Sequence, residues 1–493
     1  MSNIDISAWD KRNIFVTQGK KLQVRPGLRR VATPDEGRVW VGGFTVQNPF
    51  TFEVWHYVAD VDEDGHDLKI RIFDDDFVVF QSYDTGVDVI PRGFSCGIVL
   101  DEIMIGSPDM PTLWGKVGSG IVAAVKVDRG PNGLTAIDIP RGLVTAFCNR
   151  IVIANGNSLF FSDGATSSGG SIRTFVGENQ NQRPGVIHGI HEGANGMLVA
   201  VTSAGVYGLS ADASAVDIIG SNGTPWVLLN RTTSISYDSS CNVKGRIFAL
   251  TTKGIALVDT ESENDDELDE AMIPRLYGNR IAADTWQQER LFAGEDGPMI
   301  AYEDVVLWSS VARRARSWWS YRDSTWRAIG TLINIDGTRL LLAKDGAYKM
   351  GGNFDGEQLL STAITNQAVG VLAGVVETAP EMNPTARKLT AATSLGGTGL
   401  MRLAVRGDAQ SPAPSSPFAD IRCLIIGTSS WGDAAVYLPA QLASQRQEFS
   451  LNSDELSIEL AVDYPSTRIM PTVTLELSKS APTRANDRGG ATS

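Results

Sequence analysis

The sequence predicts an all-β protein built around a β-propeller, and three observations lead to this prediction. Apolar residues come in runs of five to eight, rich in β-branched and aromatic side chains, for example 39–46 and 52–59. Such runs are too short for helices and indicate strands. The 50 glycines recur between these runs, as tight turns require. A hairpin pattern also returns at near-constant spacing.

The repeat consists of an apolar strand that contains Ala, a turn with Gly, and a second apolar strand. Five copies are separated by 47, 49, 44 and 49 residues, and their reference residues are Arg150, Met197, Arg246, Arg290 and Arg339. Four-stranded propeller blades repeat at about 40–50 residues. One further step upstream reaches Glu102, which opens a sixth copy, and a seventh blade fits residues 38–82.

A propeller gives this repeat a physical purpose. A four-stranded blade cannot bury both of its faces alone, so blades stack radially and share their cores. We expect the Ala positions to lie on the inner strand, where space near the axis is crowded. Six blades are expected and seven are allowed. A run of hairpins in a sandwich or solenoid is the alternative.

The repeat also sets the expected domain boundaries. Residues 1–35 are expected to form an N-terminal arm and a ring-closing strand, and residues 36–355 the propeller. Residues 356–480 contain apolar runs without the repeat, which fits a C-terminal β-sandwich-like domain. Residues 481–493 contain no apolar run and are expected to be a flexible tail.

Composition excludes several classes of protein. The net charge of −14 argues against a dedicated nucleic-acid binder, which needs a basic face. The four cysteines form no CxxC pair, so free thiols are expected rather than a zinc site or a disulfide framework. The first residues lack the apolar core of a signal peptide, and no window reaches about 18 continuous apolar residues. Neither secretion nor a membrane span is therefore expected.

One loop resembles a calcium site. Asp60, Asp62 and Asp64 precede Gly65, and carboxylates on alternate residues could converge on one hard cation. An EF-hand needs Glu at the twelfth position of the loop, which here is Arg71. A polar hairpin tip is the simpler interpretation, and the sequence leaves calcium binding open.

No motif assigns a catalytic, cofactor-binding or metal-binding residue. His188 and His191 form HxxH, but a separation of three puts side chains on opposite faces of a strand. The sequence GTSSWG at 427–432 is only a loose echo of a nucleophile elbow, and there is no Walker loop or GxGxxG fingerprint. We therefore expect no enzyme and no cofactor.

Two charged segments have several interpretations. Residues 259–270 contain eight acidic side chains and no basic one, which fits a solvated loop or a docking surface. Residues 313–327 interleave five arginines with three tryptophans and a tyrosine. Strand packing, a protein interface and nucleic-acid contact all remain open for this segment, because arginine and aromatic side chains serve each of them.

The layout resembles the tail nozzle, or tail hub, proteins of short-tailed bacteriophages, also called packaged DNA stabilisation proteins. The likeness covers most of residues 20–478 and rests on pattern and spacing. The segments that carry it are RPGLRR at 25–30, the strand pair at 142–163, the following blade at 184–210, and the C-terminal runs at 378–399 and 457–478.

The resemblance implies a structural role. Such a protein would form a homo-oligomeric ring, expected to be hexameric, below the head–tail adaptor in the virion tail, after synthesis in the cytoplasm of the bacterial host. It would extend the channel for double-stranded DNA, retain packaged DNA, take part in genome ejection, and seat tail fibres or tailspikes. The alternatives are a propeller-fold glycan-active enzyme and a non-enzymatic propeller scaffold for protein–protein interaction.

Overall fold

The structure is a computed structural model of the chain. It describes residues 28–350 except 128–134, 164–170, 194–195, 211–225, 232, 235, 252–253, 259–289, 295–296, 303–304, 311–314 and 321–326; before and after this range it describes only strands. All regular elements in these residues are β-strands. The chain divides into two units, of which one comprises residues 30–312 and 321–350.

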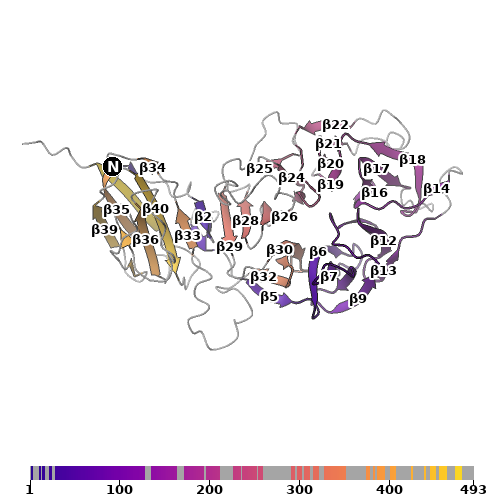
Figure 1. Cartoon of the computed structure of the whole chain (residues 1–493), viewed down its shortest axis with the longest axis horizontal. Helices are drawn as coiled ribbons and strands as arrows, with labels where there is room; N and C mark the ends of the chain where they lie inside the picture. Colours follow the sequence, from indigo (N-terminus) through magenta and orange to yellow (C-terminus); the bar gives the residue numbers. More distant parts are fainter. Residues whose placement is uncertain are drawn as a thin grey trace, which may run out of the picture. The chain divides into compact units, whose positions relative to one another are not determined.

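This unit is a ring of short antiparallel sheets (Figure 1). Six groups form separate sheets, and the seventh, blade 6, is a run of three consecutive strands within a larger sheet. The groups are blade 1 (β6 Arg38–Gln47, β7 Val54–Asp62, β8 Lys69–Phe73, β9 Val79–Asp84), blade 2 (β10 Ser95–Val99, β11 Glu102–Ser107, β12 Met110–Lys116, β13 Gly120–Ala123), blade 3 (β14 Ala136–Ile137, β15 Leu143–Phe147, β16 Arg150–Asn155, β17 Ser158–Ser162, β18 Phe175–Gln182), blade 4 (β19 Ile187–Glu192, β20 Leu198–Thr202, β21 Gly205–Leu209, β22 Val227–Asn230), blade 5 (β23 Ser240–Val243, β24 Arg246–Thr251, β25 Gly254–Leu257), blade 6 (β26 Arg290–Ala293, β27 Pro298–Tyr302, β28 Val305–Ser310) and blade 7 (β30 Ala328–Ile333, β31 Arg339–Ala343, β32 Gly346–Met350, β5 Leu28–Ala32).

One strand of each group contacts a strand of the next group around the ring, and it is the first strand in every blade except blade 3, where it is β15. Contacts join β10 to β15, β15 to β19, β19 to β23, β23 to β26, β26 to β30 and β30 to β6. The expected propeller is therefore confirmed. Six of its groups are separate sheets, the number of blades that the sequence favoured. The group β26–β28 contains one of the six repeat copies, and residues 38–82, where the sequence allowed a seventh blade, lie in blade 1.

Hydrophobic cores lie between the blades, as the stacking argument requires. One cluster joins blades 1 and 2, for example through Val41 and Ile103. Further clusters join blades 2 and 3, 3 and 4, and 4 and 5. Blades 1 to 5 thus bury their facing surfaces against one another, and burial of apolar area contributes about 25 cal/mol per Å².

The ring closes where blade 7 meets blade 1. Trp40, Val58 and Leu342 belong to one buried cluster at this seam. In blade 7 the outer strand is β5, which comes from the beginning of the chain, so residues far apart in sequence complete one sheet. Blade 7 thus combines strands from the two ends of the unit, and their pairing closes the ring.

The repeat positions mark the second strand of most blades. Arg150, Arg246 and Arg339 are the first residues of β16, β24 and β31, whereas Arg290 opens β26. The expected place of the Ala positions was wrong, because these residues lie on second strands rather than on the innermost ones. Examples are Ala154, Ala200 and Ala249, which are buried in the cores between blades. Both faces of a second strand are covered by neighbouring blades, and this explains the small side chain there.

The second unit comprises residues 1–29, 313–320 and 351–493. Its described strands include β33 Gly374–Glu377, β35 Ala386–Ser394, β36 Leu400–Arg406, β39 Gln445–Ser450, β40 Glu455–Asp463 and β41 Thr472–Lys479. β35 pairs with β39 and β41, and β40 pairs with β33 and β36, all antiparallel. These pairings establish β-structure in this part of the chain, while the sandwich stays a prediction.

Candidate functional site

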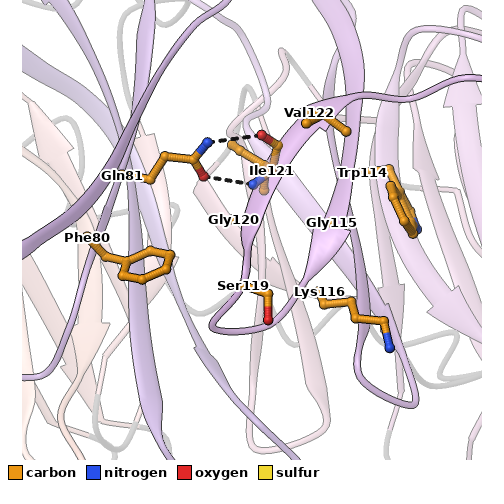
Figure 2. Close-up of a pocket in the computed structure, with 9 residues that line it drawn as sticks. All are labelled: Phe80, Gln81, Trp114, Gly115, Lys116, Ser119, Gly120, Ile121 and Val122. Atoms are coloured by element: carbon orange, nitrogen blue, oxygen red, sulfur yellow. Dashed lines mark hydrogen bonds between the residues drawn. The ribbon is translucent and has the colours of Figure 1, made fainter.

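An open groove lies between the outer strands of blades 1 and 2 (Figure 2). Its volume is about 490 Å³. β9 forms one wall, and the hairpin of β12 and β13 forms the other. The lining residues are Phe80, Gln81, Trp114, Gly115, Lys116, Ser119, Gly120, Ile121 and Val122.

The side chain of Gln81 spans the groove. Its Nε2 donates to the carbonyl of Ile121 at 3.2 Å, and its Oε1 accepts the Ile121 N–H at 2.8 Å (Figure 2). A primary amide can reproduce the donor and acceptor pair of a neighbouring strand. Gln81 therefore satisfies the edge of β13 at this residue and fixes the two blades relative to each other.

Most of the remaining groove surface is apolar, and parts of it are exposed to solvent. Phe80 is 51% exposed and Val122 is 52% exposed. Trp55 meets the ring of Phe80 edge-on, with the ring centroids 5.2 Å apart. Lys116 is the basic side chain of the lining, and it is paired with Asp101 at 2.8 Å. Exposed apolar side chains concentrated in this way are typical of protein interaction surfaces.

A short loop beside the groove presents two more aromatic side chains. Phe50 and Phe52 are both 64% exposed and lie between β6 and β7. The buried Asn48 holds the loop: its Oδ1 accepts the N–H of Phe50 at 2.9 Å and of Thr51 at 3.2 Å, and its Nδ2 donates to the carbonyl of Val117 at 3.2 Å. The loop is thereby fixed to the turn between β12 and β13.

The acidic residues of the possible calcium loop do not converge. Asp60 is fully buried, and its carboxylate accepts from Arg38 Nε at 2.9 Å and pairs with Arg71. Asp62 Oδ1 instead accepts the N–H of His66 at 2.7 Å. Burial raises the pKa of Asp60, while Arg38 and Arg71 act in the opposite direction. Asp60 thus belongs to an internal ion cluster, which favours the polar-hairpin interpretation of the loop.

The two histidines of the HxxH motif bind different serines. His188 Nδ1 lies 3.2 Å from Oγ of Ser234, which is itself 2.6 Å from Oγ of Ser239. His191 Nε2 lies 2.9 Å from Oγ of Ser240. Burial lowers the pKa of both histidines, to about 4 for His191. They are neutral at pH 7 and anchor the segment that leads into β23.

Other sequence features fall partly or wholly beyond the described residues. The acidic segment 259–270 and the sequence 427–432 lie outside them, and of 313–327 only strand β29, Ala315–Ser320, and Arg327 are described. Cys96, Cys148 and Cys241 are free, and Cys423 lies outside the described residues. Within the part of the chain that is described, no three His, Cys, Asp or Glu side chains gather as a metal site, and no helix could cross a bilayer.

Sequence reasoning missed the groove and the aromatic loop. The apolar run FVVFQ at 77–81 predicts a strand, but the sequence does not show that its side chains are exposed. An unusual feature was that Phe50, Phe52 and Phe80 are large apolar residues close to turns, where polar residues dominate. That signal is weak without the fold.

The fold defines the class of protein: an all-β propeller. No model of a known protein family and no curated protein matches the chain. Among solved structures it is similar to YCF48 bound to D1 peptide (TM-score 0.38, 12% identity, 69% of this chain and 99% of that chain). It is also similar to a streptogramin B lyase (0.39, 12%, 66% and 96%) and to the WD40 repeats of RRP9 (0.41, 8%, 66% and 92%). At these values the matches carry no argument about activity.

Proposed function

We propose that this chain is a non-enzymatic structural subunit of the tail nozzle of a short-tailed bacteriophage. In this proposal it assembles with copies of itself as a ring below the head–tail adaptor in the virion tail. The ring extends the channel for double-stranded DNA, retains the packaged DNA until ejection, and seats tail fibres or tailspikes. The resemblance of segments 142–163 and 184–210 to that family supports this choice among propeller functions.

The observation that supports the structural role is that buried polar side chains bond within the unit, while large aromatic side chains are exposed. Asp60, His188 and His191 hold strands and loops together inside the unit. Aromatic side chains at positions 50, 52 and 80 face solvent instead of the core. Rigid blades with an apolar rim are suited to packing against other proteins.

The charge of the chain agrees with a channel protein. Its net charge of −14 repels the phosphate backbone, so DNA can move past such a surface without being held by counterion release. Because the chain has no overall positive charge, it would contact an adaptor or fibre protein through local patches of its surface.

The test is assembly on the expected partner. The purified full chain is mixed with a purified portal–adaptor complex and imaged by negative-stain electron microscopy, and we expect an added ring below the adaptor. A parallel screen for glycan hydrolysis addresses the enzyme alternative. The proposal fails if adaptor that binds its other partners recruits none of this chain, or if steady hydrolysis is found that one carboxylate substitution abolishes.

A further inference from the structure

We propose that Arg290, Arg327 and Lys344 form a binding site for a phosphate dianion on the propeller. These three residues are called the basic cluster. Its ligand is inorganic phosphate or a terminal phosphate group on a larger molecule, because both present the same dianion. The site would exist in the isolated chain, whether or not the chain assembles as a nozzle.

Two residues of the basic cluster lie at the same end of blade 7. Arg327 directly precedes β30, and Lys344 lies in the turn between β31 and β32. Ala328 of β30 pairs with Ala343 of β31, so the two cations occupy neighbouring positions just beyond this pair. The N–H of Lys344 donates to the carbonyl of Arg327 at 2.9 Å.

The third residue comes from the neighbouring blade. Arg290 is the first residue of β26, which contacts β30, and β30 in turn contacts β6 (Figure 1). Nη1 of Arg290 donates to the carbonyl of Val41 on β6 at 2.6 Å. The N–H of Trp40, the preceding residue, donates to the carbonyl of Lys344 at 2.9 Å. The main chain at 40–41 therefore holds Arg290 of blade 6 and Lys344 of blade 7 at one place.

No carboxylate neutralises the basic cluster within the described part of the chain. The ion pairs of lysine and arginine there involve other residues, namely Arg30, Arg38, Lys69, Arg71, Arg92, Lys116, Lys126 and Lys349. Asp345 follows Lys344, but its carboxylate pairs with Arg30 and accepts from the hydroxyl of Tyr348. The basic cluster is thus a local positive site in a chain whose net charge is −14.

The electrostatics of the basic cluster favour a bound anion. All three residues are partly buried. Burial lowers the pKa of Lys344, and the positive charges of Arg327 and Arg290 lower it further. Like charges held together away from bulk water repel one another, and an anion between them removes that repulsion. A phosphate dianion fits better than a single carboxylate, because its oxygens can meet two guanidinium groups and an ammonium group together.

The test is isothermal titration calorimetry of the full chain with inorganic phosphate at physiological ionic strength. The variants are Lys344→Gln and Arg327→Gln. Lys349→Gln is the matched control, since it removes the same charge in blade 7 from a side chain that pairs with Asp336. We expect saturable binding to one site on the wild type and on the control. Each cluster variant should bind at least tenfold more weakly, or by about 1.4 kcal/mol.

Two further measurements keep the test decisive if a variant folds poorly, which circular dichroism would show. Phosphate should raise the melting temperature of the wild type, because it binds the folded state. Acetate, a carboxylate with a single charge, should bind the wild type at least tenfold more weakly than phosphate. Heats that do not saturate in the millimolar range, equal affinities for phosphate and acetate, or a folded Lys344→Gln that binds like the wild type overturn the inference.

Oligonucleotides distinguish the two sources of the phosphate group. A short single strand is titrated with and without a 5′-phosphate. Binding of the phosphorylated strand at least tenfold tighter than its counterpart identifies a terminal phosphate as a ligand. Binding of inorganic phosphate alone identifies the free ion. Equally tight binding of both strands would indicate contact with the phosphodiester backbone and would contradict a site for a dianion.

Discussion

The carboxylate of Asp60 is a buried charge that pairs with two arginines of blade 1. Asp60 has no exposed surface and balances Arg38 and Arg71, whose side chains are 11% and 9% exposed. Asp60→Asn keeps the volume and removes the charge, leaving two nearly buried guanidinium groups without it. We expect a loss of about 3–5 kcal/mol in the free energy of unfolding. Urea denaturation measures it, with the exposed Asp76→Asn as a control that should change stability by less than about 0.5 kcal/mol.

The histidine at the seam of the ring makes stability depend on pH. Burial lowers the pKa of His56 to about 4, although Asp74 acts in the opposite direction. Its Nδ1 lies 3.0 Å from Oγ1 of Thr45, and its ring stacks on Phe77. The unfolded chain, with an ordinary histidine pKa near 6.5, binds the proton first as pH falls. Stability is therefore fully present above about pH 6.5 and decreases down to about pH 4, by up to about 3 kcal/mol for this residue.

The variant His56→Gln removes that titration. Urea midpoints measured between pH 7 and pH 4 should fall less steeply for the variant than for the wild type. Some dependence should remain, because the pKa of His191 is lowered to the same range. Identical slopes in the two proteins would contradict a neutral buried His56.

At the scale of elements, the position of β5 rests on a glycine. Gly346 has a φ of +151°, and a Cβ there would lie 2.1 Å from the carbonyl oxygen of Ala32 on β5. Gly346→Ala should push β5 away from β32 and cost about 2 kcal/mol or more. Hydrogen exchange of the amides at 28–32 should accelerate. Gly337→Ala is the control, since its site has a φ of +77° and no atom within 4 Å, so only backbone strain of about 1–2 kcal/mol applies.

The loop that presents Phe50 and Phe52 depends on one side chain. Asn48→Ala removes two acceptor contacts to loop N–H groups and one donor contact to Val117. We expect a loss of about 1–3 kcal/mol in stability, because buried partners lose their hydrogen bonds. Urea denaturation of the variant and the wild type measures this loss. Equal stability of the two proteins would contradict the role of Asn48 in holding the loop.

The blades could be predicted from the sequence repeat, whereas the ion pairs and the exposed side chains could not. The second strands β16, β24 and β31 begin at Arg150, Arg246 and Arg339. They could be located because the same hairpin recurs from blade to blade at a spacing that is visible in the sequence. The ion cluster joins Asp60 to Arg38 and Arg71, which are 22 and 11 positions away in sequence. The alternation of polar and apolar residues along a strand cannot show which charged residues pair. The exposure of Phe80 depends on how blade 2 meets blade 1, which is a tertiary property.

For the molecule as a whole, the acidic charge makes a direct prediction about DNA. The isolated chain should bind duplex DNA more weakly than non-specific DNA-binding proteins, whose dissociation constants at physiological salt are about 10⁻⁴–10⁻⁶ M. Fluorescence anisotropy with a labelled duplex at two salt concentrations tests this. Tight binding with a steep salt dependence would contradict a channel past which DNA moves freely.

The amide of Gln81 has a consequence for chains that crowd together on one particle. A bare outer strand invites another strand to extend the sheet, and repeated extension ends in fibres. The side chain of Gln81 already bonds both the N–H and the carbonyl of Ile121, so these groups cannot pair with another strand. At this residue the outer strand of blade 2 offers no free main-chain pair to a neighbouring copy, so extension of the sheet from chain to chain is disfavoured there.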